Sequence, residues 1–281
     1  MIPPITELES ARLREYIEGV CGIRLDKSKE YLLESRLAHL VLEYGFLSFG
    51  ELYQEARLAR NIHLRDRIID AMTTHETFWF RDDSAWRFLD ERVIPSVLDK
   101  ILAGEHPRVW CAAASSGQEV YSFVMMMLEK ASHRGMRLRP EQFHVLGTDI
   151  SQSVLFQAIS GLYDVFTIGR GLPLDLQEKY FHVNGRMWEI EDEVKAFATF
   201  RKFNLQDSFN SVNGPYDLIL MRNVAIYFSD GFKRELFEKT SRVMQKGGIL
   251  LLGATESLRG LSDVFDIQEY KTCTYNVLKS E

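Results

Sequence analysis

Polar side chains follow an apolar run near residue 220 at a spacing that suits ligand binding. Residues 216–221 are mostly apolar, which is typical of a buried strand, and Arg222, Asn223 and Tyr227 come next. They offer a guanidinium, an amide and a phenol. Ligands of open α/β sheets bind at the carboxyl ends of the strands. The run therefore predicts a binding site, although one such run is as typical of a polar loop that only caps a sheet.

Three further predicted strands also end in small or polar residues. Residues 112–117 are small, so a ligand can approach the backbone and the positive end of the next helix. Glu119 repels phosphate and favours a cationic or zwitterionic ligand, and the glycine pattern of dinucleotide sites is missing. Asp149 can accept two ribose hydroxyls, and Asn204 can hold an adenine edge. Together these strand ends predict a site for a nucleoside with an amino-acid tail, which fits S-adenosylmethionine.

An unusual cluster precedes the first predicted strand. Residues 73–82 combine two neighbouring threonines, three consecutive aromatic side chains and Arg81. One interpretation is a helix start with Thr77 as its cap and Arg81 in solvent. The other interpretation places the cluster at the ligand site.

The elements that must position these groups change in type near residue 75. Before it the pattern is helical: Thr6 and Glu9 form a capping box, further helices begin near Ser28 and Ser48, and a fourth spans residues 64–72. After it, strands and helices alternate. The strands are predicted at residues 108–113, 143–148, 198–203, 216–221 and 248–252.

The end of the chain and one insertion complete the predicted fold. Residues 266–269 and 274–278 suggest an antiparallel hairpin at the edge of the sheet. Asn184-Gly185 predicts a second hairpin, which forms a small β-insertion at about residues 178–198. The prediction is a doubly wound α/β sheet over residues 76–281, preceded by a small all-helical domain over residues 1–75.

Bulk properties narrow the class of protein. The net charge of -6 argues against a general nucleic-acid binder. No apolar run reaches the roughly 18–20 residues that cross a bilayer, and the start of the chain lacks the pattern of a signal peptide. Three scattered cysteines and no metal-ligand cluster among the seven histidines suit a protein of the reducing cytoplasm. The helical part carries a cluster of arginines, which are Arg57, Arg60, Arg65 and Arg67. The cluster is either a solvated face or a docking face for an acidic partner.

These motifs, in this order, closely resemble the chemotaxis-receptor methyltransferase (CheR) family over nearly the whole chain. The family carries TTxxTxFFR at the domain junction, AAxSxGxExYS after the first strand, Asp after the second, xNL after the third and RNVxIYF after the fourth. The corresponding stretches here are residues 73–81, residues 112–122, Asp149, residues 204–205 and residues 222–228. Position 75 is His, where the family often has Asn.

The resemblance implies a class I methyltransferase (Rossmann-like) sheet that binds S-adenosylmethionine and releases S-adenosylhomocysteine. It implies O-methylation of glutamate side chains on chemoreceptor helices, with catalytic roles for Arg81 and Tyr227. Cofactor contacts are carried over by position onto His75, Thr77, Arg81, Glu119, Asp149, Asn204, Leu205, Arg222 and Asn223. The alternative is a signalling module that binds the cofactor without catalysis.

The resemblance also bears on partners. Glutamate-rich receptor helices would suit the basic face of the helical domain. Some family members bind a receptor's C-terminal pentapeptide by strand addition to the hairpin of the insertion. The hairpin around Asn184-Gly185 is short, so we expect no pentapeptide binding here.

Overall fold

The structure is a computed structural model that describes residues 3–280. Its N-terminal part is entirely helical, as predicted. Thr6 and Glu9 form the expected capping box, and Ser48 accepts a hydrogen bond from Glu51 N–H at the start of the third helix. Apolar residues on the inner faces of these helices form one core. The helices are α1 (Glu7–Cys21), α2 (Glu30–Glu43), which a short 3-10 turn (Lys27–Lys29) precedes, α3 (Phe49–Ala56) and α4 (Ile62–Met72).

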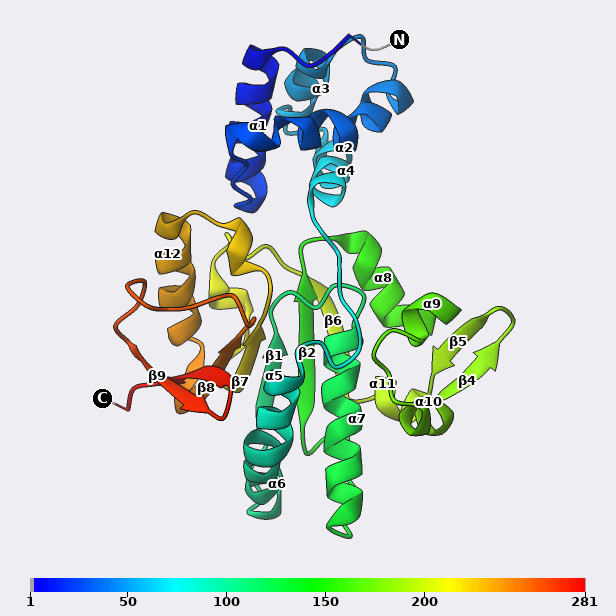
Figure 1. Ribbon diagram of the computed structural model, residues 1–281, viewed down its shortest axis with the longest axis vertical. Coiled ribbons are helices and arrows are strands. Elements are labelled where there is room, and N and C mark those ends of the chain that lie inside the picture. Colours follow the sequence, from blue (N-terminus) through cyan, green and yellow to red (C-terminus); the bar gives the residue numbers. More distant parts are fainter. Residues whose placement is uncertain (1–2, 281) are drawn as a thin grey trace.

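A seven-stranded sheet forms the larger part of the molecule (Figure 1). The strand order is β6-β2-β1-β7-β8-β10-β9, and all neighbours are parallel except those that pair with β10. The order reverses beside β1, which creates the switch point where ligands of such sheets bind. The strands are β1 (Arg108–Cys111), β2 (His144–Asp149), β6 (Ala198–Lys202), β7 (Tyr216–Met221), β8 (Met244–Leu252), β9 (Phe265–Tyr270) and β10 (Cys273–Leu278).

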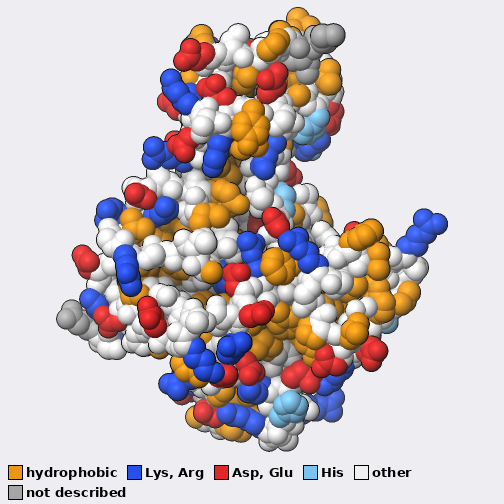
Figure 2. Space-filling model, in the orientation of Figure 1, with side chains coloured by type: hydrophobic (Ala, Val, Ile, Leu, Met, Phe, Trp, Pro, Cys, Tyr) orange, Lys and Arg blue, Asp and Glu red, His pale blue; other side chains and the backbone are white. Residues whose placement is uncertain are grey.

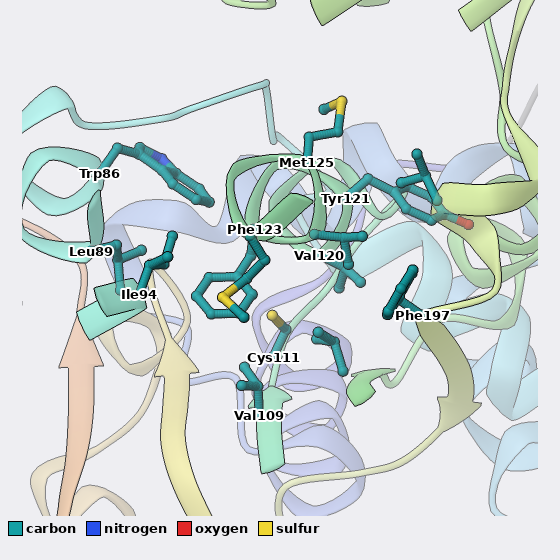
Figure 3. Close-up of a cluster of buried hydrophobic side chains, with 14 of the residues drawn as sticks. Trp86, Leu89, Ile94, Val109, Cys111, Val120, Tyr121, Phe123, Met125 and Phe197 are labelled. Atoms are coloured by element: carbon teal, nitrogen blue, oxygen red, sulfur yellow. The ribbon is translucent and has the colours of Figure 1, made fainter. Parts of the chain in front are cut away.

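Helices cover both faces of the sheet because the side chains of each strand alternate between them. In β1, Val109 and Cys111 pack in one core and Trp110 packs in the other. Figure 3 shows the first core, where Phe123 and Val120 approach the side chains of β1. The covering helices are α5 (Asp83–Phe88) and α6 (Ile94–Leu102), joined by a π-helical segment (Leu89–Val93), with α7 (Gln118–His133), α8 (Gln152–Ser160) and α12 (Asp230–Ser241).

The predicted β-insertion exists, but it is larger than the range 178–198. It is a three-stranded antiparallel sheet in the order β3-β5-β4, and its first strand is already at β3 (Leu162–Tyr163). Asn184 pairs with Met187, so the two turn residues are Gly185 and Arg186, one position later than the Asn-Gly signal suggests. The other elements here are α9 (Val165–Ile168), α10 (Leu174–Tyr180), β4 (Phe181–Asn184), β5 (Met187–Ile190) and α11 (Asp192–Lys195).

The N-terminal helices lie at one end of the sheet, above the linker (residues 73–82) that descends to α5 (Figure 1). Ile23 forms an isolated antiparallel bridge with Phe228, and Lys202 pairs with Asp66 at 2.6 Å. The helical part therefore contacts the loops that follow β6 and β7. None of the helices between residues 3 and 280 combines the length and apolar character that crossing a membrane requires.

Candidate active site

A cavity opens at the carboxyl ends of β1, β2, β6 and β7, with about 940 Å³ of space that is partly open to solvent. Residues from the helical part, the linker and the loops after these strands all line it. The sequence-predicted residues among them are His75, Thr77, Arg81, Glu119, Asp149, Asn204, Leu205, Arg222, Asn223 and Tyr227.

Arg222 is buried and ties the wall of the cavity together. Its Nη1 donates to Glu119 at 2.6 Å, and its Nη2 donates to Asp82 at 2.9 Å and to the carbonyl of Arg81 at 2.5 Å. Burial raises the pKa of Glu119, and the charge of Arg222 acts in the opposite direction. Three donors of the guanidinium fork are thus used inside the protein, which leaves its buried Nε without a partner among the described residues. An acceptor on a ligand would satisfy that nitrogen.

Asp149 ends β2 as predicted and is almost fully buried. One carboxylate oxygen accepts from Ser115 N–H at 2.9 Å, and the other accepts from Ser151 N–H at 3.0 Å. Burial raises the pKa of Asp149, and these backbone donors act to lower it. Each oxygen keeps a second acceptor site, so two ligand hydroxyls can still be accepted.

The side chain of Asn204 is used differently from the expectation that it holds an adenine edge. Its Nδ2 donates to the carbonyl of Val20 at 2.9 Å, and its Oδ1 accepts from Gln206 N–H at 3.0 Å. Gln206 in turn donates to the carbonyl of Glu18 at 2.9 Å. The last carbonyls of a helix have no partner within it, and Asn204 satisfies that of Val20. The carbonyl of Glu18 already accepts from Gly22 N–H at 2.9 Å, so Gln206 adds a second bond there. Asn204 joins the helical part to the loop after β6.

The linker, residues 73–82, is not the start of a helix, because α5 begins only at Asp83. Arg81 Nη1 donates to the carbonyl of Glu76 at 3.0 Å, and its guanidinium carbon lies 5.5 Å from the centroid of the Phe78 ring. The remaining guanidinium donors of Arg81 have no protein acceptor in the described part of the chain. Arg81 is therefore oriented and still able to bind an anion.

His75 lines the cavity, but its ring turns toward the end of α4. Its Nε2 lies 2.9 Å from Thr73 Oγ1 and 3.3 Å from the carbonyl of Asp70. Its own carbonyl accepts from Ser115 Oγ at 3.0 Å. Through these contacts, the imidazole holds the linker against the end of α4.

Tyr227 lies in a 3-10 turn (Ala225–Tyr227) after β7. Its carbonyl accepts from Arg24 N–H at 2.9 Å, so a segment of the helical part holds its backbone. No protein partner of the Tyr227 hydroxyl occurs among residues 3–280. The phenol is free to bind a substrate group in the cavity.

Unusual backbone angles gather around the cavity. Among the described residues, five other than glycine have positive φ, and four of these belong to the segments that form the site. Such angles cost of order 1–3 kcal/mol each and cluster at functional sites. The four are Phe80, Asp82, Ser115 and Asn223.

Sequence reasoning missed four contributors to this region. Cys21 and Ile23 bring the helical part into the cavity wall, and Asp82 pairs with Arg222. Glu256 follows β8 and binds the backbone of residues 223–226. A signal existed for Glu256, because it is a carboxylate just after a fifth buried strand at the same edge of the sheet. Across residues 3–280 no group of three His, Cys, Asp or Glu side chains could hold a metal ion.

The strand order, the helices on both faces and the cavity at the switch point define a class I methyltransferase fold. Within it, three acidic residues, small residues at the end of β1 and aromatic side chains that include Phe203 and Phe228 surround the ligand space. This set suits a nucleoside with a charged amino-acid tail.

Comparison with known proteins gives the family. A model described as the CheR methyltransferase SAM binding domain matches residues 75–274, and the CheR methyltransferase all-alpha domain matches residues 9–73. The chain belongs to the CheR methyltransferase family. It is a methyltransferase whose cofactor is S-adenosylmethionine, as the resemblance in sequence implies.

Individual relatives agree with the family models. The chemotaxis protein methyltransferase of Vibrio anguillarum is 40% identical over 266 residues, which is 94% of each chain. Chemotaxis protein methyltransferase 1 of Pseudomonas aeruginosa is 38% identical over 90% of this chain and 92% of that relative. Among solved structures, a TehB-like SAM-dependent methyltransferase from Corynebacterium glutamicum covers 71% of this chain and 96% of its own, with 12% identity. Its TM-score of 0.37 is too low to inform function.

Proposed function

We propose that this enzyme transfers the methyl group of S-adenosylmethionine to glutamate side chains of chemoreceptors, forming methyl esters. The observation that carries the proposal is that Arg81 and Tyr227, from opposite segments, line one cavity with Glu119 and Asp149. Both have donors that the described part of the protein leaves free. The names of the relatives support a chemotaxis role.

Six residues are proposed to hold the cofactor. Asp149 accepts the ribose hydroxyls, while Glu119 with Arg222 binds the charged amino-acid tail. The backbone around Leu205, rather than the amide of Asn204, lies against the base. Thr77 and Asn223 complete the wall. When bound, S-adenosylmethionine supplies a methyl group on a positively charged sulfur.

An ionised acceptor explains why the site lacks a free base. A glutamate with an ordinary pKa is a carboxylate at neutral pH, so no proton must be removed. Among the described residues that line the cavity, the one histidine is His75, and its ring contacts Thr73 and α4. Methylation of a hydroxyl or an amine would require a base at this place. The arrangement therefore favours a carboxylate acceptor.

The protein's part in the reaction is to position and to exclude water. Tyr227 donates a hydrogen bond that orients the acceptor carboxylate, and Arg81 neutralises and aligns it. Arg81 must not bind the carboxylate too tightly, because that would stabilise the ground state more than the transition state. The apolar walls remove solvent that would otherwise stabilise the separated charges.

The direct test measures transfer of labelled methyl from S-adenosylmethionine to the cytoplasmic fragment of a chemoreceptor. Base treatment then follows. We expect the label to leave as methanol, as a carboxyl ester requires. A label that resists base would exclude this acceptor, and cofactor binding without transfer to any receptor fragment would favour the sensor alternative.

We propose a boundary near residue 75 between an N-terminal receptor-docking domain and the catalytic domain. The two family models support it, since they meet between residues 73 and 75. The helices also have a core of their own. A cytoplasmic location accords with the three free, buried cysteines, which are Cys21, Cys111 and Cys273.

The proposed docking face is less uniformly basic than the sequence suggests. Arg67 is bound at both nitrogens by Glu43, at 2.8 and 2.7 Å, and Arg60 lies 3.8 Å from Glu55. Figure 2 shows acidic and basic side chains interspersed on the visible side of the helical part. Arg57, which stacks on Tyr53, and Arg65 are exposed. These two are the strongest candidates to meet an acidic receptor helix.

Charge reversal tests this face. Arg57→Glu with Arg65→Glu should raise the KM for the receptor fragment and leave cofactor affinity unchanged, because rim charges act mainly on association. Reversal of Arg67, which already has a partner, is the matched control and should act less on KM. An unchanged KM in the double variant would contradict the docking role.

We propose no pentapeptide binding by the β-insertion. Its hairpin strands β4 and β5 have four residues each, and a two-residue turn joins them. A strand added to this sheet could form only a short ladder. Calorimetric titration with a receptor-tail pentapeptide should show no heat of binding, and tight binding would refute the proposal.

A further inference from the structure

Glu256 lies in the loop after β8, and its carboxylate accepts four backbone hydrogen bonds. Oε2 accepts from Asn223 N–H and Gly253 N–H, both at 2.7 Å. Oε1 accepts from Val224 N–H at 3.0 Å and Ile226 N–H at 3.1 Å. Three of the four donors belong to the catalytic loop, residues 222–228, which carries Tyr227.

The four donors match what one carboxylate can accept. An ionised carboxyl group has about four lone-pair sites, and bonds to it are roughly twice as strong as bonds between neutral groups. The catalytic loop has no sheet or long helix to satisfy its N–H groups, and Asn223 holds a positive φ of 57°. Backbone groups in such a segment need other partners. Glu256 supplies them at a single point.

The close approach of the two loops depends on Gly253. A Cβ atom there would lie 2.7 Å from Asn223 Nδ2, 2.8 Å from Glu256 Oε2 and 2.9 Å from Asn223 N. These distances are too short for any real Cβ. The glycine thus lets Glu256 reach under the catalytic loop.

The contacts lead from Glu256 to the backbone of Tyr227. Val224, which Glu256 binds, accepts from Tyr227 N–H through its carbonyl at 3.2 Å. Arg24 N–H holds the carbonyl of Tyr227 from the other side. Glu256 itself is not among the residues that line the cavity. Its effect on a reaction there has to pass through the catalytic loop.

We propose that Glu256 is a positioning residue that sets the Tyr227 hydroxyl against the acceptor carboxylate. The inference rests on the proposed function, in which Tyr227 orients that carboxylate. It extends that function because it names the side chain that places Tyr227, which is Glu256 in the loop after β8.

Glu256→Gln is the first variant to measure. A carboxamide oxygen can accept from one pair of N–H groups, while its NH₂ faces the other pair and repels it. We expect kcat to fall on the order of a hundredfold, the cost of a displacement of about 1 Å at a reacting group. Affinity for S-adenosylhomocysteine, measured by calorimetry, should change only a few fold. Glu269→Gln, an exposed carboxylate on β9, is the matched control and should keep the kcat of the unaltered enzyme.

A double-mutant cycle separates positioning from general damage. If Glu256 acts through Tyr227, adding Glu256→Gln to Tyr227→Phe should lower kcat little further, since coupled sites are not additive. Losses that multiply in the double variant would overturn the inference. Circular dichroism and a thermal melt establish that each variant is folded. If Glu256→Gln fails to fold, Glu256→Asp, which keeps both oxygens on a shorter stem, takes its place in the cycle.

The outcomes distinguish this inference from the proposed function. If the unaltered enzyme yields no base-labile methyl on receptor fragments, the proposed function fails. If it does, and Tyr227→Phe loses kcat while the folded Glu256 variant keeps it, only the positioning role fails.

Discussion

The linker and the catalytic loop flank the same cavity but are held by different kinds of contact. The catalytic loop is fixed through its backbone, by Glu256 and by Arg24 N–H. The linker is fixed through its backbone and through side chains of its own. Trp79 N–H donates to the carbonyl of Arg170 at 3.2 Å, and Arg36 donates to the carbonyl of Thr73 at 3.3 Å. The side chain of Trp79 adds a bond from its Nε1 to the carbonyl of Thr167 at 3.0 Å. A loop held by its backbone keeps its shape when its own side chains change. The linker has that protection only in part, because it also depends on its own Trp79 side chain.

Arg222 connects the two segments, so its loss should have the largest effect. Arg222→Met leaves Glu119 and Asp82 without their cation, and removing one partner of a buried ion pair typically costs about 3–5 kcal/mol. Urea unfolding should show a loss of this size. Arg222→Lys keeps the charge without the fork and should lose less. Equal stability of the Met variant would mean that the two segments are not joined through this residue.

Tyr227→Phe tests the catalytic loop alone and should rank second. Its backbone anchors remain, so the loop keeps its shape and only the donor is lost. One aligned donor is worth about 3 kcal/mol of barrier, or roughly a hundredfold in kcat. Single-turnover rates with a receptor fragment measure the loss, and cofactor affinity should hardly change. Tyr275→Phe, whose hydroxyl contacts Gln268, provides the control. Full turnover by Tyr227→Phe would remove the phenol from the mechanism.

In the proposed site, Asp149 holds the cofactor ribose, and Ser115 joins it to the linker because Ser115 Oγ donates to the carbonyl of His75. Because burial raises the pKa of Asp149, it takes up a proton at a higher pH than an ordinary aspartate. The protonated form accepts fewer hydrogen bonds, so affinity for S-adenosylmethionine should fall as the pH is lowered through the raised pKa. Calorimetry across mildly acidic pH measures this, with Asp149→Asn as comparison. If Asp149→Asn shows a similar pH dependence, the effect comes from Glu119 instead, because burial raises the pKa of Glu119 too.

The outer side of the linker should give the smallest effect. Glu76 and Arg170 pair at 2.6 Å, but each side chain is more than half exposed. Exposed pairs of this kind contribute little to stability, so Glu76→Gln should leave the midpoint of urea unfolding nearly unchanged. A larger loss in urea unfolding would show that this surface pair, and not Arg36 and Trp79, holds the linker.

The same contrast explains how much could be predicted from the sequence. The strand ends and their polar residues were predictable, because apolar runs mark buried strands and parallel strands end at one edge. The partner of Asn204 was not, since it lies 184 positions away in α1 and depends on how the helices dock. Strand β3 has two residues, too few to show a period. Glu256 follows a fifth buried strand, but its partners could not be predicted, because they are backbone N–H groups that only the folded loop brings near it.

The end of α1 has a consequence for how the chain can be divided. Asn204 and Gln206 donate to carbonyls near the end of α1, and Cys21 at that end and Ile23 just after it line the cavity. A catalytic fragment that begins at residue 76 would expose these amides and lack one wall of its pocket. The two parts are therefore poor modules for exchange between relatives. A graft of another N-terminal helical part would have to carry matching residues at both the end of α1 and the loop after β6.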